Sequence, residues 1–209
     1  YNLVFRYKDV PILYAPFLSF PLSKKRHSGF LYPTIGSSGE SGTVLSAPYY
    51  LNLAPNYDIT FTPTNFSGRG LMFEAEIRHK AKNTNTEIEL ANLSGDRVKS
   101  VGGKSGSRHA YFIRDRRVFL DSLKLLNNAY TGSRVETEIN AGGVSDLTYF
   151  DDFGNTVGRV GRSHILRRAK FSRLDYGDFG KMETRIMTEG YQIAQAGLTE
   201  QYKRIPQIK

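Results

Sequence analysis

Two adjacent aspartates and a histidine are the side chains of this sequence that best suit catalysis. Asp151, Asp152 and His164 lie in or beside the longest polar segment, residues 142–162. Paired carboxylates with an imidazole could activate water by general base catalysis, as in a protease whose active site lies on the rim of a β-barrel. A solvated acidic loop explains the same residues equally well, because nothing in the sequence fixes their geometry.

Other reactive residue types give no support for a metal or cofactor site. The four histidines, at positions 27, 79, 109 and 164, lack the close spacing of metal ligands, and cysteine is absent. Residues 103–105, Gly-Lys-Ser, resemble the end of a phosphate-binding loop, but Val98 stands where that motif requires its first glycine. We therefore expect no metal, no cofactor and no catalytic residue.

The composition narrows the class of partner. Lys and Arg number 29 against 20 Asp and Glu, which gives a formal net charge of +9. The basic residues occur singly or in short clusters with acidic residues between them. No nucleic-acid-binding motif accompanies them, so nucleic acid is not expected as a partner. The 13 Tyr and 13 Phe suit sheet surfaces and membrane interfaces, where one end of a ring is wet.

The elements that position these residues are predicted to be strands. Apolar and polar side chains alternate most clearly in residues 57–64, 71–78, 86–92 and 133–141. Each such strand has one apolar face and one polar or charged face, a pattern shared by soluble sandwiches and membrane barrels. Alternation alone therefore leaves both architectures open.

The connections between the strands favour an up-and-down arrangement. About nine strands follow Gly29, with short turns at one end of the sheet and longer loops at the other, which is typical of outer-membrane barrels. Residues 94–107 are predicted to be a polar Gly/Ser-rich loop. Residues 118–128 carry apolar side chains at helical spacing and predict a short helix. No apolar run approaches the roughly 18 residues of a membrane-spanning helix.

The first predicted hairpin carries a proline in each strand. Residues 29–35 and 43–53 are apolar and aromatic and flank the Gly/Ser-rich segment 36–42, and Pro33 and Pro48 lie inside the two runs. Because proline has no N–H, strands that contain it pair poorly with their neighbours. The hairpin is either an edge protected against aggregation or a seam that is built to open.

Five segments in order along the chain carry a resemblance to a known family. They are residues 7–17 (YKDVPILYAPF), 26–33 (RHSGFLYP), 48–58 (PYYLNLAPNYD), 144–153 (VSDLTYFDDF) and 202–208 (YKRIPQI). Together they resemble the LptD family, also called OstA or Imp, the lipopolysaccharide-assembly proteins of the Gram-negative outer membrane. These matches are more specific than the alternation of polar and apolar residues.

The resemblance implies an all-β fold in two parts. Residues 1–28 would form the end of a periplasmic β-jelly-roll and the linker that follows it. Residues 29–209 would form the N-terminal portion of an antiparallel, up-and-down transmembrane β-barrel of about 26 strands. We therefore expect a piece of a longer protein in the outer membrane of a Gram-negative bacterium, with its N-terminal part in the periplasm.

The resemblance also implies a function that needs no catalysis. Lipopolysaccharide would be transported and inserted into the outer leaflet, by lateral release of lipid A between the first and last barrel strands. Pro33 and Pro48 would weaken strand pairing at this lateral gate. Lys24, Lys25 and Arg26 of the linker are candidates for contacts with lipid phosphates, and a solvated linker explains them equally well.

The partners implied by the resemblance are lipopolysaccharide, the plug lipoprotein LptE, the periplasmic LptA bridge that joins through the jelly-roll, and outer-membrane lipids. Two alternatives from other functional classes stay open at this point. One is the barrel protease with rim aspartates, and the other is a nonspecific diffusion pore.

Overall fold

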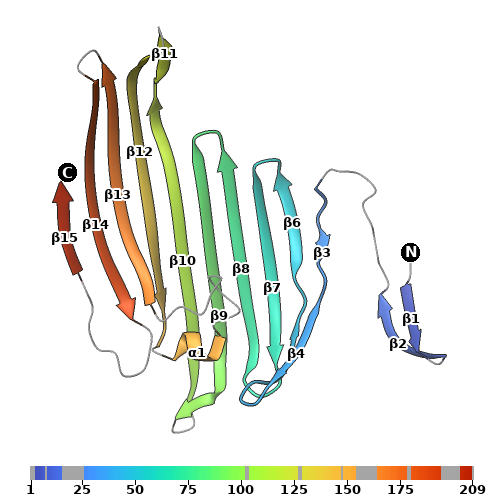
Figure 1. The fold of residues 1–209 in the computed structure, drawn as a ribbon. Coiled ribbons are helices and arrows are strands. Elements are labelled where there is room, and N and C mark those ends of the chain that lie inside the picture. Colours follow the sequence, from blue (N-terminus) through green and yellow to red (C-terminus); the bar gives the residue numbers. More distant parts are fainter. Residues whose placement is uncertain are drawn as a thin grey trace.

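The chain folds almost entirely into antiparallel β-sheet (Figure 1). The computed structural model describes residues 3–7, 9–15, 26–101, 104–126, 129–146, 148–153, 164–177, 180–193 and 203–208. Strands β1 (Leu3–Tyr7) and β2 (Val10–Ala15) pair with each other in a two-stranded sheet. The remaining strands form a 13-stranded sheet. They are β3 (Gly29–Phe30), β4 (Thr34–Ser38), β5 (Gly42–Ser46), β6 (Tyr49–Ala54), β7 (Tyr57–Phe66), β8 (Gly70–Ala81), β9 (Thr84–Val101), β10 (Lys104–Asp121), β11 (Lys124–Leu126), β12 (Ala129–Val144), β13 (His164–Gly177), β14 (Gly180–Ile193) and β15 (Lys203–Ile208).

Strands of the large sheet pair in the order in which the chain makes them. The main path is β15-β14-β13-β12-β10-β9-β8-β7-β5-β4, and successive strands along it run antiparallel. Connections therefore alternate between the two ends of the sheet, as Figure 1 shows. The predicted all-β, antiparallel, up-and-down arrangement is confirmed. Within the described residues, the sheet is open, with β4 at one edge and β15 at the other.

One face of the sheet is apolar although nothing in the described chain covers it. The register places apolar side chains opposite one another, so that Phe61, Ala75, Leu90 and Tyr111 form one row across four strands. Leu90 and Tyr111 remain 43 % and 40 % exposed. A belt of exposed apolar and aromatic side chains on a regular sheet is the expected lipid-facing surface of a membrane barrel. We call it the apolar face.

The opposite, polar face carries charged side chains and the only short helix of the described chain, α1 (Tyr149–Phe153). Along β10 and β9, Arg114 pairs with Glu87 at 3.0 Å and with Glu89 at 2.7 Å. The buried apolar residues cluster where α1 packs on this face. They are Phe66, Met72, Ala91, Leu93, Ala110, Phe112, Val144, Tyr149, Phe150, Phe153 and Ile165.

Two local predictions were wrong. The helix predicted for residues 118–128 is instead the end of β10 followed by β11, because Val118 and Asp121 continue the ladder with β12. Phe119, which carried the helical spacing, is 65 % exposed and packs into no core. The loop predicted for residues 94–107 is mostly strand, since β9 and β10 continue their hairpin to Val101 and from Lys104. Among the described residues, no helix has the length and hydropathy needed to cross a membrane.

Candidate functional site

The first hairpin is interrupted at both of its prolines. Pro33 lies between β3 and β4, and Pro48 lies between β5 and β6. The register changes by one residue across this break, because Phe30 pairs with Tyr49 whereas Thr34 pairs with Ser46. Three residues of the first strand therefore oppose two of the second, which is a β-bulge and locally disrupts the ladder.

Two backbone pairs at the break make only half of their hydrogen bonds. The N–H of Leu31 donates to the carbonyl of Pro48 over 2.8 Å, and the N–H of Ala47 donates to the carbonyl of Pro63 over 3.1 Å. Partners of this kind normally exchange two hydrogen bonds, but the prolines have no N–H to return. Each missing bond has a net value of about 1 kcal/mol, and more where no water can replace it.

The third proline of this region, Pro33, lies between β3 and β4, in the stretch at the free edge of the described sheet. It has no N–H to donate to a neighbouring strand. Pro48 and Pro63 lack the donors that would complete the pairs with Leu31 and Ala47.

The linker end of the hairpin is fastened through Asp58 of β7. This carboxylate belongs to a residue that is 4 % exposed. It accepts hydrogen bonds from Arg26 over 3.0 Å, from Tyr50 over 3.2 Å and from Arg78 over 2.7 Å. The side-chain amide of Asn52 donates to the carbonyl of Arg26 over 3.1 Å. The chain that enters β3 is therefore tied to both β6 and β7.

This geometry bears on the linker residues singled out in the sequence. Arg26 has Asp58 as its partner in the structure, while 63 % of its side chain is exposed. Lys24 and Lys25 lie outside the described residues. Contacts of these three residues with lipid phosphates stay a prediction.

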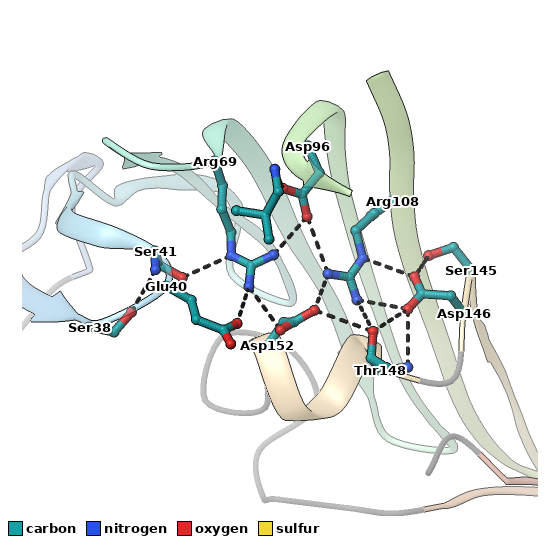
Figure 2. Close-up of polar contacts among 11 residues, drawn as sticks. Ser38, Glu40, Ser41, Arg69, Asp96, Arg108, Ser145, Asp146, Thr148 and Asp152 are labelled. Carbon is teal, nitrogen blue, oxygen red and sulfur yellow. Dashed lines mark hydrogen bonds and ion pairs between the residues drawn. The ribbon is translucent and has the colours of Figure 1, made fainter. Parts of the chain in front are cut away.

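At the other end of the sheet, two arginines are buried side by side (Figure 2). Arg69, in the turn between β7 and β8, is 1 % exposed, and Arg108 of β10 is 2 % exposed. Both bind Asp96 of β9, whose Oδ2 lies 2.9 Å from Nη1 of Arg69 and 3.2 Å from Nη1 of Arg108. A buried guanidinium requires such partners, because an uncompensated buried charge costs several kcal/mol.

The segment around α1 supplies the other carboxylates. Oδ1 of Asp152 accepts a hydrogen bond from Nη2 of Arg69 over 2.8 Å, and its Oδ2 accepts one from Nη1 of Arg108. Asp146 binds Arg108 in a bidentate pair, at 2.9 Å to Nε and 2.8 Å to Nη2. Figure 2 shows the two arginines alternating with the three aspartates. We call Arg69, Asp96, Arg108, Asp146 and Asp152 the arginine–aspartate cluster.

The turn of the first hairpin joins this cluster through Arg69. Nε of Arg69 donates to Oγ of Ser41 over 3.0 Å, and Nη2 donates to Oε2 of Glu40 over 3.0 Å. Ser41 is 5 % exposed, but the side chain of Glu40 is 75 % exposed. An ion pair with so exposed a carboxylate contributes at most about 1 kcal/mol to stability. The link to Glu40 is therefore the weakest connection of Arg69.

Aromatic packing holds α1 against the same residues. The ring of Phe153 meets the ring of Phe66 edge-on with centroids 5.5 Å apart, and the guanidinium of Arg108 lies 4.7 Å from its centroid. Val44 of β5 packs against this apolar cluster. A cavity of about 690 Å³ separates the hairpin turn from α1, with Glu40, Val44, Phe66, Asp151 and Phe153 among its lining residues.

The electrostatics of the α1 segment follow from its burial and its partners. Burial of Asp146 opposes its ionisation, but hydrogen bonds from Ser145 and Arg108 outweigh this effect and hold its pKa below the ordinary value. Burial raises the pKa of Tyr149 above its ordinary value. The aspartate is therefore ionised and the phenol neutral at physiological pH.

The residues considered for catalysis do not assemble into a catalytic site in the described part of the chain. Both oxygens of Asp152 are engaged by arginines. Asp151 lines the cavity, and the backbone of His164 begins β13 opposite Ile193, while its side chain lies outside the described residues. No group of three or more potential metal ligands occurs among the residues that the structure covers.

The sequence indicates Asp152 but not its partners. Arg69 lies in the connection between the predicted strands 57–64 and 71–78, Asp96 lies in the predicted loop 94–107, and Arg108 follows that loop directly. The one local signal was Arg69 itself, a charged residue between two glycines, Gly68 and Gly70. The backbone of Gly68 approaches the hairpin turn closely, since its N–H donates to the carbonyl of Ser41 over 3.0 Å and a Cβ atom at this position would lie 2.9 Å from the carbonyl oxygen of Glu40.

Comparison with known proteins gives consistent matches along the chain. A family model described as "LptD protein" matches residues 2–95, and one described as "LPS transport system D" matches residues 107–209. LPS-assembly protein LptD of Nitrosospira multiformis is 34 % identical over 211 residues, which cover 99 % of this chain and 21 % of the relative.

Two further relatives carry the same name. LPS-assembly protein LptD of Hahella chejuensis is 33 % identical, over 99 % of this chain and 25 % of the relative. That of Pseudomonas aeruginosa is 31 % identical, over 99 % of this chain and 21 % of the relative. The chain thus spans about a fifth to a quarter of the length of these curated relatives.

Proposed function

Because the chain belongs to the LptD family, we propose that it forms the part of an outer-membrane β-barrel wall through which lipopolysaccharide leaves sideways. The family is one of lipopolysaccharide transport and assembly at the outer membrane, and not one of enzymes. Its proteins are outer-membrane β-barrels, and the large antiparallel sheet is this chain's share of that wall.

The two faces of the sheet support this assignment. The apolar face suits contact with lipid, and the polar face, which carries α1, suits the lumen of a wide barrel. In this orientation the linker end of the first hairpin faces the periplasm and the hairpin turn faces the outside. Residues 1–28 then belong to the periplasmic jelly-roll and its linker.

The main support for the proposed gate is that two backbone pairs, beside a proline at the sheet edge, each make one hydrogen bond instead of two. Leu31 with Pro48 and Ala47 with Pro63 each share one hydrogen bond where a regular ladder has two. Pro33, which has no N–H, lies in the edge segment that would meet the last strand of the barrel. Lipid A is released between these two strands, because their pairing is weaker than that of the rest of the wall.

The partners of the proposed function follow the same geometry. Lipopolysaccharide arrives from the periplasmic LptA bridge through the jelly-roll, LptE fills the lumen, and outer-membrane lipids surround the apolar face. The basic linker residues Lys24, Lys25 and Arg26 lie at the periplasmic entrance, where phosphate groups of the lipid would pass.

Restoring the missing donors tests this function. In the full-length protein, the double substitution Pro33→Ala and Pro48→Ala should strengthen the gate by about 1 kcal/mol per restored hydrogen bond and lower the amount of lipopolysaccharide at the cell surface. Pro55→Ala is the matched control, because Pro55 lies in the turn between β6 and β7, outside the break.

The readout should also locate the lipid. A photoreactive residue at Tyr32, which is 87 % exposed beside Pro33, should crosslink to lipopolysaccharide in the wild-type background and less in the double variant. Undiminished surface delivery by the double variant, at equal protein level, would contradict the proposed gate.

A further inference from the structure

We propose that α1 is a latch on the gate hairpin, and that Arg69 is the positioning residue through which it holds the outer half of that hairpin closed. This inference rests on the proposed gate. It concerns β4–β5, which we call the outer half, as distinct from β3 and β6, the inner half next to the linker.

The two halves of the hairpin meet at the break in β-pairing. The bulge shifts the register between the two strands of the hairpin by one residue. On the other side, β5 and β6 pair with β7 in one register, but at the break itself only the hydrogen bond from Ala47 to Pro63 joins them to β7. The inner half is fastened at the linker end through Asp58 and Arg26, and the outer half has contacts of its own at the opposite end.

The backbone attachment of the outer half is short. Strand β5 pairs with β7 through Val44, Leu45 and Ser46, and single backbone hydrogen bonds from Ser67 to Thr43 and from Gly68 to Ser41 extend this attachment to the turn. Strand β4 has all five residues exposed and pairs with β5 alone within the described sheet. Side-chain contacts at the turn therefore add a substantial share to the hold on this half.

Arg69 makes the side-chain contacts to the hairpin turn and also binds α1. One guanidinium binds Glu40 and Ser41 of the hairpin turn, Asp96 of β9 and Asp152 of α1, as Figure 2 shows. Its Nη2 donates to both Glu40 and Asp152. The carboxylate of Asp152 in α1 therefore fixes the position of the guanidinium to which Glu40 of the hairpin turn binds.

An apolar path runs parallel to the polar one. Val44 of the outer half pairs across the ladder with Phe66, and Phe66 packs against Phe153 of α1. Between these contacts lies the cavity of about 690 Å³, which leaves the hairpin turn room to move on the lumenal side. The outer half can thus separate from α1 by breaking its exposed link to Glu40 first, while the buried part of the cluster stays intact.

The first arm of the test weakens the latch. In the full-length protein with its plug, Glu40→Ala should raise crosslinking of lipopolysaccharide to a photoreactive residue at Ile35, which is 77 % exposed on β4, by up to about fivefold. Glu183→Ala is the matched control, because Glu183 pairs with Arg185 over 2.5 Å on β14, away from the hairpin, and should leave crosslinking at Ile35 unchanged.

The second arm locks the latch. Ser37 and Asp151 both line the cavity, one from β4 and one from α1. Bridging Ser37→Cys and Asp151→Cys with a short bifunctional maleimide should abolish crosslinking at Ile35, whereas each single cysteine variant treated with the same reagent should behave as wild type.

The outcomes separate the latch from the gate. Wild-type crosslinking at Ile35 both in Glu40→Ala and in the bridged variant overturns the latch and leaves the gate standing. If the wild-type protein gives no lipopolysaccharide crosslink at either Tyr32 or Ile35, the gate itself is wrong and the latch falls with it.

Discussion

Replacing Asp152 by asparagine isolates the charge that holds α1 on the sheet. In the structure this carboxylate is 11 % exposed and bridges Arg69 and Arg108. Removing one partner of a buried ion pair costs about 3–5 kcal/mol. We expect the lower end, about 3 kcal/mol, because both arginines keep Asp96. At about 1.4 kcal/mol per factor of ten, the open state of α1 should become roughly a hundred times more populated.

Amide hydrogen exchange measured on the full-length protein tests this number. The reporting group is the backbone N–H of residue 152, which in the parent protein donates to the carbonyl of Thr148 over 3.1 Å. Its protection should fall by about two orders of magnitude in Asp152→Asn. Asp151→Asn is the control, since Asp151 is an exposed neighbour on the same helix. A fall of less than tenfold in Asp152→Asn would refute the view that the charge cluster anchors α1.

Two other predictions concern the hairpin and the pH dependence of the cluster. Pro63→Ala should return one hydrogen bond to Ala47, stabilise the outer half by about 1 kcal/mol and lower surface lipopolysaccharide, which quantitative surface labelling would measure. The pKa of Asp146 lies below its ordinary value of 3.8, so its contribution to the anchoring of α1 is complete above that pH and is lost as the pH falls below it. Exchange at α1, corrected for intrinsic rates, should therefore accelerate in that acid range, and Asp146→Asn should weaken this dependence.

The alternation of polar and apolar residues predicted the strands and their two faces because it reports a local property. Residues such as Phe61 and Phe73 face outward wherever their strands sit, and the structure stacks their rings 5.7 Å apart on the apolar face. The resemblance of five ordered segments to the LptD family is confirmed by the family matches. Both conclusions needed only information that is contiguous in the sequence.

The arginine–aspartate cluster could not be predicted in this way, because its members are brought together by the register of the sheet. Arg69 and Asp152 are 83 residues apart, and Arg108 and Asp146 are 38 apart. Asp96 looked like part of a polar loop, whereas it is a buried strand residue whose charge is neutralised by both arginines. Pro63 was overlooked for a related reason, since its strand alternates regularly and only its bond with Ala47 shows the missing donor.

The helix was misplaced because helical spacing over a few residues is compatible with a strand that has exposed apolar side chains. Residues 118–126 satisfy their backbone groups through the ladder with β12, so no helix forms there. The segment 149–153 forms one because four of its side chains, Tyr149, Phe150, Asp152 and Phe153, all have partners on the polar face of the sheet.

The three prolines lie at one level of the sheet, and this alignment has a mechanical consequence. Pro33 lies in the edge segment, Pro48 is opposite Leu31, and Pro63 is opposite Ala47, so the ladders on both sides of residues 47–48 each lack a donor along one line that crosses the strands. Peeling strands apart breaks bonds one after another, so each missing bond lowers the resistance only at its own position. Bending concentrates the strain on a single level, where all the missing bonds act at once. We therefore expect the hairpin to bend at this line first, and its strands to separate along their length only afterwards.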